Sequence, residues 1–595
     1  MLTRIVSRAP GFLASLFYCL VVVTLGLVAV YDKRLFHYAT SGYLVAPAAL
    51  YVAAALALVA VALLALVRRH ADATGRDAGA EGVPRSGDRG FYLVLVACFA
   101  AAYLAQLFVS SHIYFRTGWD VQIIDGEVLR HLQGEAWQSE EGRYYFSVYP
   151  NNLLLLHTLV SLRQLGAALC PAAPERLLQY ATCVPANVAT LLSCCSVYKL
   201  TARKGLALAC AAVGIVLVVF SPWMVIPYSD QVAILFPSLA LFCWTFVRRP
   251  APRYALASFA CVVGYYYKPT AIFALAAIAL VAVSELPRLL AREGHSHGGR
   301  GRVWWRAGTA LVAALVGAGA AVGLYCAVTA PDQAVLDGDA RMTWTHFLMM
   351  GLNPETEGYW NGDDVTFSEL QPNVAAREGA NREVIAQRVR DLGPRGLLIQ
   401  MAKKDMLAYG DGTFAWGIES GFFSEIPQDE RPATALLRSV FYPSEVEGRG
   451  GGEHYEAWAS LEQVLWFSVL ASTTLNLAAF GGRRRRLGDD KDVGAASGTA
   501  PGAARHLAPG AAGSGCERDP EEARRAMRNA AATSLLALSL FLMLFETRAR
   551  YLFLYAPIYV MLAGLGLDAA DRRIACWRAS RTSQTRAAHA AKAAD

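Results

Sequence analysis

The sequence predicts an all-α integral membrane protein with about 12 to 13 transmembrane or re-entrant helices and a helical segment on the outer face of the membrane. Of its 595 residues, 55% are hydrophobic and only 17% are charged, and the mean hydropathy is +0.32. Ordinary soluble domains carry roughly a quarter charged residues. Apolar runs of about 20 residues, the length that crosses a bilayer, recur along the chain. These features exclude a disordered chain and argue against a soluble multidomain enzyme.

The apolar runs define the expected membrane helices in chain order. Those long enough to cross a bilayer cover residues 11–31, 42–67, 91–111, 205–226, 231–247, 307–328, 461–480, 529–545 and 551–568. Shorter or interrupted runs cover residues 150–166, 178–198, 253–267 and 270–284.

Basic residues between these runs predict the orientation. The net charge is +7, but Lys and Arg are spread over short loops and form no cluster of the kind that nucleic acid needs. Because cytoplasmic loops accumulate Lys and Arg, we expect a multi-pass plasma-membrane protein with both termini in the cytoplasm. One of the two runs between Tyr149 and Lys199 must then be re-entrant or interfacial, and either 150–166 or 178–198 fits that description.

This topology divides the chain into five parts. Two outside-facing segments, 112–149 and 329–460, are large enough to carry a site. The linker 481–528, expected in the cytoplasm, is rich in Gly, Ala, Pro and Arg and is expected to be disordered. In order, the parts are an N-terminal helix hairpin with its cytoplasmic linker (1–90), a membrane core (91–328) with its first outer loop (112–149), a large extracytoplasmic segment (329–460), C-terminal membrane helices (461–570) around the second linker (481–528), and a basic cytoplasmic tail (571–595).

The first outer loop carries three candidate catalytic acids, Asp120, Asp125 and Glu127. Solvated loop charge is the ordinary explanation for any one of them. Asp120 differs because it follows Trp119, an aromatic residue typical of membrane interfaces, and opens a stretch with helical apolar spacing. A carboxylate at the water–lipid boundary suits general-base work on a hydroxyl whose partner substrate is a lipid.

Two further segments supply candidate pocket residues where the chain re-enters the membrane. The loop returns through Tyr149, Asn151 and Asn152, whose amides either cap the next helix or line a polar pocket. Tyr228 and Asp230 repeat the arrangement before the run that begins at 231.

Three cations on the predicted outer side break the charge pattern of the loops. Lys268 lies between two apolar runs with almost no loop, and Arg548 and Arg550 lie between the last two helices. Snorkelling accounts for a single cation at this depth. Three cations on one face instead favour a phosphate held at the outer boundary, because Arg offers bidentate contacts and Lys a point charge.

The large outer segment adds His346, which we expect to contact acceptor or phosphate. Its Asp337-Gly338-Asp339 triplet imitates a metal-binding D-x-D but is interpreted as ordinary loop, so no metal ligand is assigned. The chain has no Walker loop, no H-E-x-x-H and no G-x-G-x-x-G after a strand, which argues against a nucleotide-driven pump or a zinc protease.

Taken in order, these motifs resemble the GT-C superfamily of polytopic glycosyltransferases. The resemblance is carried by the acidic first outer loop, YPNN at 149–152, Lys268-Pro269 at a helix hairpin and E-x-R-x-R-Y at 546–551. It is closest to the bacterial branch related to protein O-mannosyltransferases and the aminoarabinose transferase. The stretches THFLMMGLN, GYWNGDDV and GDGTFAWG look like a Gram-positive subgroup of that branch. The match covers residues 91 to about 480 and 546–568.

The resemblance implies a polyprenyl-phosphate sugar as donor and an acid of the first outer loop as the catalytic group. That position carries over most naturally to Asp120. The commonest family pattern has an adjacent acidic pair, which this loop lacks, so Asp125 and Glu127 stay alternatives. No cofactor is obligatory, and a divalent metal beside Asp120 stays open.

The resulting hypothesis is sugar transfer from a polyprenyl phosphate to a hydroxyl of a cell-envelope polymer or protein. Lys268, Arg548 and Arg550 would stabilise the phosphate leaving group, and the pocket residues would hold sugar or acceptor. The expected partners are this lipid-linked donor, the acceptor and membrane lipid, with no nucleic acid. The rival hypothesis is a lipid-linked saccharide flippase or other transporter, which predicts charged or broken helices at the bilayer midplane. Sugar, acceptor, metal dependence, stereochemistry and oligomeric state are left open.

Overall fold

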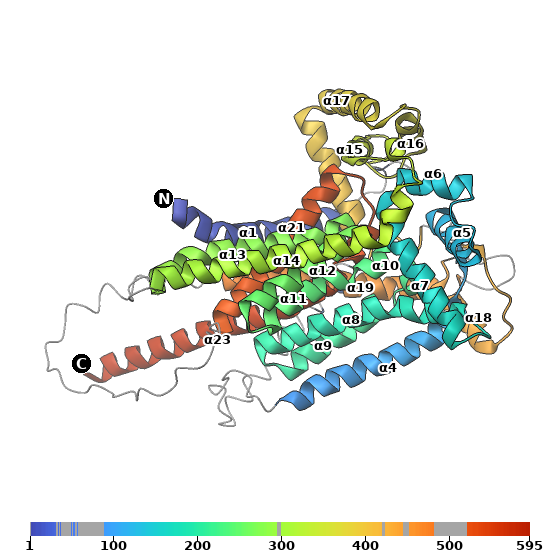
Figure 1. Cartoon of the computed structure of the whole chain (residues 1–595). Coiled ribbons are helices and arrows are strands. Elements are labelled where there is room, and N and C mark those ends of the chain that lie inside the picture. Colours follow the sequence, from blue (N-terminus) through green and yellow to red (C-terminus); the bar gives the residue numbers. More distant parts are fainter. Residues whose placement is uncertain are drawn as a thin grey trace.

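The computed structural model is a bundle of long helices with a smaller helical segment at one end (Figure 1). It describes residues 2–30, 88–293, 299–418, 423–443, 452–480 and 520–594, together with 34, 36, 49, 52, 53 and 56. The predicted run 42–67 falls almost entirely outside the described residues, as does most of the linker 481–528. The end of that linker is helical, because α21 begins at Pro520.

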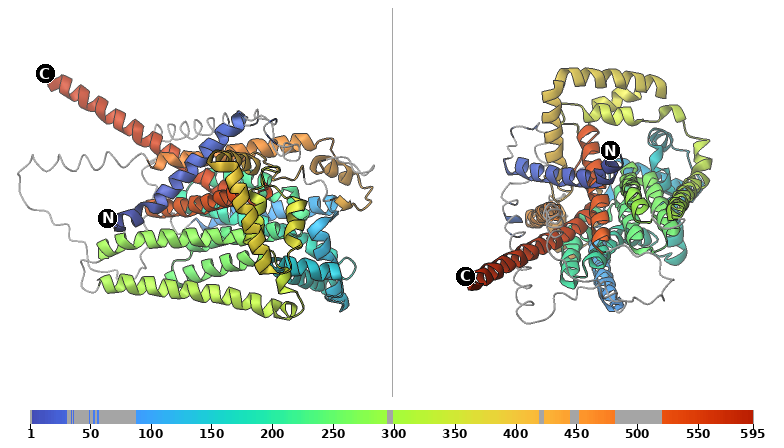
Figure 2. Two further views of the ribbon diagram at one scale, coloured as in Figure 1. Left: turned by 90° about the horizontal axis from the view of Figure 1, so that it is seen from above. Right: turned by 90° about the vertical axis from the view of Figure 1, so that its left-hand side faces the viewer.

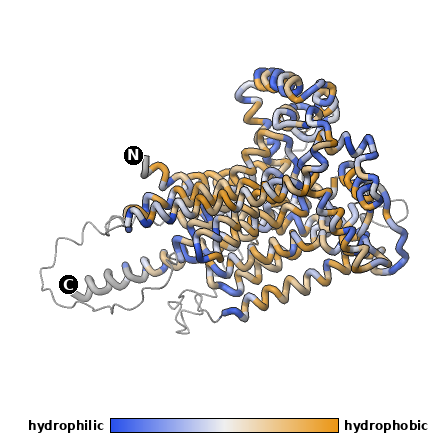
Figure 3. Tube along the Cα trace, in the orientation of Figure 1, coloured by the Kyte–Doolittle hydropathy of each residue, from blue (hydrophilic) through white to orange (hydrophobic). Residues whose placement is uncertain are grey.

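The described chain is all-helical apart from two short strands, which confirms the predicted fold class of an all-α integral membrane protein. Eight helices among the described residues are long and apolar enough to cross a membrane, and Lys204–Val219 is a shorter apolar helix. Figure 3 shows the apolar residues concentrated along the bundle and the polar ones at its ends. The long helices of the bundle are α1 (Leu2–Ala29), α4 (Arg89–Ile113), α8 (Glu175–Thr201), α9 (Lys204–Gly214) with its continuation η4 (Ile215–Val219), α10 (Ser229–Ala233) with α11 (Leu235–Phe246), α12 (Pro250–Tyr267), α13 (Phe273–Glu293), α14 (Gly299–Gln333), α19 (Tyr455–Thr474), α21 (Pro520–Leu544) and α23 (Ala556–Ala594).

One end of the bundle, called here the basic end, gathers the loops that the sequence predicts to be cytoplasmic. Arg203 pairs with Asp568 at 3.2 Å and Arg292 with Glu522 at 2.6 Å. Arg288 donates to the Ser7 carbonyl at 2.9 Å, which ties the start of α1 to the same loops. The N-terminus and the end of α23 both lie on this side of the bundle (Figures 1 and 2).

The opposite end, called here the segment end, carries the first outer loop and the large outer segment. Its remaining elements are β1 (Arg116–Thr117), α5 (Trp119–Gln133), α6 (Glu140–Val148), η3 (Pro150–Asn152), α7 (Leu153–Leu169), η5 (Pro222–Val225), η6 (Pro269–Ile272), η7 (Gly338–Ala340), α15 (Trp344–Gly351), α16 (Gly362–Glu369), α17 (Val374–Tyr409), β2 (Phe423–Glu425), α18 (Pro432–Phe441) and α22 (Arg550–Phe553); η9 (Leu475–Ala479) follows α19 at its far end. β1 pairs with β2 in an antiparallel ladder that the sequence did not predict.

Helix α7 resolves which of the two ambiguous runs crosses the bundle. Its Thr158 hydrogen bonds the hydroxyl of Tyr267, the last residue of α12, and its Arg163 pairs with Asp125 of α5. These partners all lie at the segment end, so α7 lies across that end although its length and composition would allow it to span (Figure 1). Helix α8 instead reaches the basic end, where Arg524 donates to the Leu200 carbonyl.

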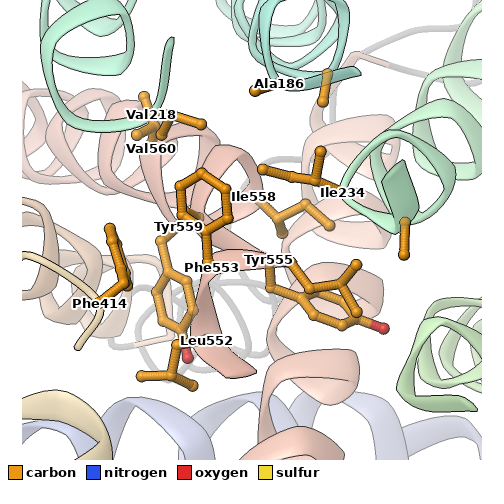
Figure 4. Close-up of a cluster of buried hydrophobic side chains, with 14 of the residues drawn as sticks. Ala186, Val218, Ile234, Phe414, Leu552, Phe553, Tyr555, Ile558, Tyr559 and Val560 are labelled. Atoms are coloured by element: carbon orange, nitrogen blue, oxygen red, sulfur yellow. The ribbon is translucent and has the colours of Figure 1, made fainter. Parts of the chain in front are cut away.

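The centre of the bundle is packed around the loop and helix that follow α21. Figure 4 shows Phe553, Tyr555 and Tyr559 surrounded by side chains from α8, α10 to α11 and the segment around Phe414. Tyr409, the last residue of α17, reaches the same core and shares a 2.5 Å hydrogen bond with the Tyr559 hydroxyl. The large outer segment is therefore anchored in the apolar core through the end of α17.

Candidate functional site

Five of the residues singled out from the sequence meet at the segment end. Asp120 lies in the first turn of α5, Tyr228 and Asp230 lie at the start of α10, Lys268 lies between α12 and α13, and Arg550 opens α22. We call this group the Asp230 cluster. Four segments that are far apart in the sequence thus bring two acids, two cations and a phenol together.

Asp230 is the centre of the cluster because both cations pair with it. Its Oδ1 lies 2.9 Å from Lys268 Nζ and its Oδ2 lies 3.4 Å from Arg550 Nε. The Asp230 side chain is only 4% exposed and that of Arg550 only 5%. Removing one charged partner from such a buried group leaves the other uncompensated, so the three charges are expected to behave as a unit.

Asp120 is linked to this group through Tyr228. The Tyr228 hydroxyl donates to Asp120 Oδ2 at 2.7 Å. Burial, followed by the nearby charge of Asp120, raises the pKa of Tyr228 well above its usual value, so the phenol stays protonated and keeps donating. Trp119, immediately before Asp120, has a φ of +45°, a left-handed conformation that is strained for a bulky residue. Strain of this kind concentrates at functional sites.

Aromatic rings surround the two cations of the cluster. The Arg550 guanidinium lies 5.0 Å from the ring centre of Trp119 and 5.3 Å from that of Trp223. Lys268 Nζ lies 4.3 Å from the ring centre of Tyr551. Cation–π contacts stabilise charges away from bulk water, so these rings help to hold the two cations in place.

Arg548, the third predicted cation, belongs to a neighbouring group. Its Nε lies 3.1 Å from Glu546 Oε1, which also accepts from the Tyr551 hydroxyl at 3.1 Å. Its guanidinium lies 4.6 Å from the ring centre of Tyr359 in the large outer segment. Tyr551 therefore connects Arg548 to Lys268, although these two cations pair with different acids.

The segment before α22 is held by backbone bonds to the large outer segment. Glu546 N donates to the Phe347 carbonyl and Thr547 N to the Gly358 carbonyl, each at 3.0 Å. Buried Lys404 donates to the carbonyls of Gly351 and Phe545 at 2.7 and 2.6 Å. These bonds position the chain that carries Arg548 and Arg550.

The predicted pocket residues after α6 form a hydrogen-bonded chain that leads to the cluster. Asn151 donates to Asn152 Oδ1 at 3.3 Å, and Asn152 donates to the Tyr145 hydroxyl at 2.7 Å. Tyr145 also interacts with the hydroxyl of Tyr228. Tyr149 packs its ring 5.4 Å from that of Tyr145, and burial together with the charge of Asp120 raises its pKa. The Asn152 amide therefore bonds Tyr145 and makes no capping bond to α7.

The structure does not bring Asp125 or Glu127 into the cluster. Asp125 pairs with Arg163. Glu127 is fully buried and accepts from the Trp137 N–H at 2.8 Å while pairing with His131 and Arg130. Burial disfavours its charge, but hydrogen bonds from His131 and Trp137 outweigh burial and lower the pKa of Glu127. Glu127 is thus a structural acid that holds α5 against the following turn.

His346 lies inside the large outer segment, 1% exposed, and not in an open pocket. Its Nδ1 is 2.8 Å from Ser368 Oγ, which in turn contacts Asn381. Burial lowers the pKa of His346 to about 4, so the ring is neutral near pH 7. This neutral buried ring packs α15 against α16 and α17.

Among the residues that the structure describes, no three His, Cys, Asp or Glu side chains gather in a way that would hold a metal ion. The arrangement instead offers a half-buried carboxylate that accepts from a phenol, next to cations held by aromatic rings and by a second carboxylate. Such a site can accept a proton from a hydroxyl and stabilise a developing phosphate charge a short way off.

Sequence reasoning missed Tyr145 and Tyr551, which join the parts of the site. Tyr551 closes the E-x-R-x-R-Y motif, but the motif assigned it no contact, and nothing in the local pattern separates Tyr145 from the other tyrosines of the chain. Only the fold shows that their hydroxyls meet Asn152 and Glu546.

Comparisons with known proteins give a family but no activity. No curated protein and no solved structure matches the chain. One family model matches residues 7–485, most of the chain, and includes four of the five residues of the Asp230 cluster. The protein therefore belongs to the family described as "conserved hypothetical integral membrane protein".

Proposed function

We propose that this protein is a GT-C-like glycosyltransferase that moves a sugar from a polyprenyl phosphate to a hydroxyl of a cell-envelope polymer or protein. The observation that carries the proposal is the convergence of Asp120, Tyr228, Asp230, Lys268 and Arg550 at the segment end. A base and phosphate-stabilising cations are the groups that such a transfer needs, because the donor supplies its own activated bond.

In the proposed reaction, Asp120 accepts the proton of the acceptor hydroxyl. The hydroxyl oxygen forms a new bond to the anomeric carbon of the donor sugar, while the bond from that carbon to the phosphate oxygen breaks. The electron pair stays on the polyprenyl phosphate, whose negative charge therefore grows. Cations already aimed at that oxygen lower the barrier without reorganising during the step.

The charges around the site limit how the phosphate binds. Three acids, Asp120, Asp230 and Glu546, accompany three cations, so the formal charges of the site cancel. Asp230 occupies one side of Lys268 and Arg550, and Glu546 occupies one side of Arg548. We infer that the two acids orient the cations and that the phosphate binds beside Lys268, whose ammonium group has three N–H donors.

The orientation in the membrane is part of the proposal. Arg203, Arg288 and Arg292 lie at the basic end, opposite the Asp230 cluster, which supports a cytoplasmic basic end and an outward-facing site in the plasma membrane. A lipid-linked donor would then reach the cluster from the outer leaflet.

The test uses purified protein and a panel of polyprenyl-phosphate sugars, with release of polyprenyl phosphate as the readout. Asp120→Asn keeps the shape of the side chain but removes the base, so we expect release to fall about 10²-fold to 10⁴-fold. Asp363→Asn is the matched control, because it makes the same change at an exposed acid of the large outer segment, and it should leave release unchanged.

The outcomes also separate transfer from transport. Undiminished release in Asp120→Asn would contradict the role of that residue. A wild-type protein that releases no polyprenyl phosphate from any donor, but moves lipid-linked saccharide between the leaflets of a vesicle, would favour the flippase.

A further inference from the structure

The motif GDGTFAWG, residues 410–417, lies against the Asp230 cluster, and we call it the Phe414 turn. The Phe414 carbonyl accepts from the indole N–H of Trp223 at 3.1 Å, and the Trp223 ring centre lies 5.3 Å from the Arg550 guanidinium. The ring of Phe414 lies 5.4 Å from that of Phe553, the last residue of the helix α22 that Arg550 opens (Figure 4). The Phe414 turn therefore reaches the surroundings of Arg550 by two routes.

The backbone that presents the Phe414 carbonyl has an uncommon conformation. Phe414 has a φ of +54° and Ala415 a φ of +67°, in the left-handed region that residues other than Gly rarely adopt. Both side chains are buried. Such a conformation costs free energy and persists only where the surrounding structure holds it. Two consecutive residues of this kind indicate that the direction of this backbone matters.

Asp411 holds the turn in this shape. Its Oδ1 accepts from the N–H and the hydroxyl of Thr413 at 2.8 and 2.7 Å, and its Oδ2 accepts from the Ala415 N–H at 2.8 Å. Asp411 is buried, so little water competes for these bonds. Hydrogen bonds to a carboxylate are stronger than those between neutral groups. Asp411 therefore fixes the direction in which the Phe414 carbonyl points.

Trp223 is also held from its own part of the chain. It lies in η5, which follows the π-helical turn η4. Turns of this kind are rare and recur at functional sites. The carbonyl of Val219, the last residue of η4, accepts from the buried Gln106 Nε2 at 2.7 Å. On the other side, the ring of Trp416 lies 5.3 Å from that of Trp223. The indole is thus fixed from both sides while its face lies near the guanidinium of the cluster.

We propose that Asp411 and Trp223 are positioning residues for Arg550. Asp411 fixes the Phe414 turn, the turn orients the Trp223 ring, and the ring holds the guanidinium that pairs with Asp230. Neither residue touches a reacting atom in the proposed reaction. The effect on the position of Arg550 is independent of that reaction, whereas the effect on turnover rests on the proposed glycosyl transfer.

The first experiment follows the position of Arg550 without any donor. Full-length protein in detergent is treated with phenylglyoxal, a reagent specific for arginine, and mass spectrometry gives the labelling rate of each arginine. Arg550 is 4% exposed and should react slowly in wild type. It should react about fivefold faster in Trp223→Phe, which loses the indole N–H, and in Asp411→Asn, which loses an acceptor, because each change removes hydrogen bonding of ordinary strength. Arg377, 3% exposed in the large outer segment, should keep its wild-type rate.

Two further variants make this experiment specific. Trp466→Phe removes another buried indole N–H, bonded to the Tyr409 carbonyl at 2.9 Å, and keeps a ring beside Phe414. As the matched control it should leave the labelling of Arg550 unchanged. Ala415→Gly added to Asp411→Asn should restore slow labelling, because Gly adopts a positive φ without strain and no longer needs the carboxylate.

Turnover gives the second readout. Release of polyprenyl phosphate should fall in Trp223→Phe and in Asp411→Asn, and the variant with both changes should be no slower than the slower single variant. The two changes break one chain of contacts, so their effects are not additive.

The inference is overturned if Arg550 keeps its wild-type labelling rate in either variant, or if Arg377 accelerates equally, since the change is then a general loosening of the fold. Failure of Ala415→Gly to restore slow labelling, or additive losses of turnover, would also overturn it. If Arg550 responds as expected but wild-type protein releases no polyprenyl phosphate from any donor, the positioning role stands and the transferase proposal fails.

Discussion

Asp230 shows how a single buried acid organises its neighbours. It pairs with Lys268 on one oxygen and Arg550 on the other, in a place where little water can screen any of the three. The sequence singled out all three residues, but it assigned Asp230 to a sugar pocket and the cations to a phosphate. The structure places the acid between the cations, so their geometry depends on it.

For the candidate catalytic acid too, the sequence identified the residues but not their partners. Spacing alone left Asp120, Asp125 and Glu127 as alternatives. In the fold, Glu127 is fully buried with its own partners and Asp125 pairs with Arg163, whereas Asp120 bonds Tyr228 of the cluster. The three acids differ in their partners, which come from distant parts of the chain.

Tyr228→Phe tests the link between Asp120 and the cluster. The variant keeps the ring that packs on Trp119 but removes the only hydroxyl recorded on Asp120 in the described chain. We expect polyprenyl phosphate release to fall about tenfold, the effect of losing one charge-assisted hydrogen bond. Tyr442→Phe, which loses a hydroxyl bonded to the Ile113 carbonyl, is the matched control. An equal effect in both variants would mean that the loss is one of stability.

At the scale of elements, the large outer segment positions the chain before α22. Gly351 permits this contact, since a Cβ there would lie 2.3 Å from the Leu544 carbonyl oxygen. Lys404 and two backbone bonds add to the junction. The motif THFLMMGLN therefore has a physical role, because its Gly351 allows the close approach that positions the chain carrying Glu546, Arg548 and Arg550.

The buried His346 predicts how this segment responds to acid. Its pKa is about 4 in the folded protein and near 6.5 when exposed. Between those values the unfolded state binds a proton that the folded state does not, so stability falls as the pH drops from 6.5 toward 4, by up to ~1.4 kcal/mol per pH unit.

The measurement is the melting temperature at pH 7.5, 6 and 5 for wild type and His346→Gln. The variant should be less stable at pH 7.5, because it loses packing and alters the bond to Ser368, but its melting temperature should fall less between pH 7.5 and 5. Parallel curves would show that His346 does not titrate in this range. Glu127 and His131 also titrate with folding, and comparing the two proteins cancels their contribution.

For the whole molecule, the two ends of the bundle differ in charge and in content. Basic loops collect at one end, and the cluster and the outer segment collect at the other. Helix α7 lies across the segment end, so only α8 of these two helices runs from the segment end to the basic end. The loops before α7 and after α8 therefore lie at opposite ends, as their charges predict.

Two native cysteines test the orientation. Cys170 is exposed directly after α7, at the segment end. Cys576 is exposed on α23, a few residues after Asp571, which pairs with Arg203 at the basic end. A membrane-impermeant thiol reagent applied to intact cells should modify Cys170, and it should modify Cys576 only after permeabilisation. Mass spectrometry of the peptides gives the readout, with Cys170→Ser as the control. The reverse labelling pattern would place the cluster in the cytoplasm.

The order of residues carries the membrane class, most of the helices and the chemical types at the site, because hydropathy and charge are local properties that it encodes directly. It did not determine the partners. The sharing of Asp230 by Lys268 and Arg550 and the Tyr228 bond to Asp120 join residues separated by up to several hundred positions. Only tertiary packing decides such contacts, because each depends on how whole helices are placed against one another and not on the residues beside it in the chain.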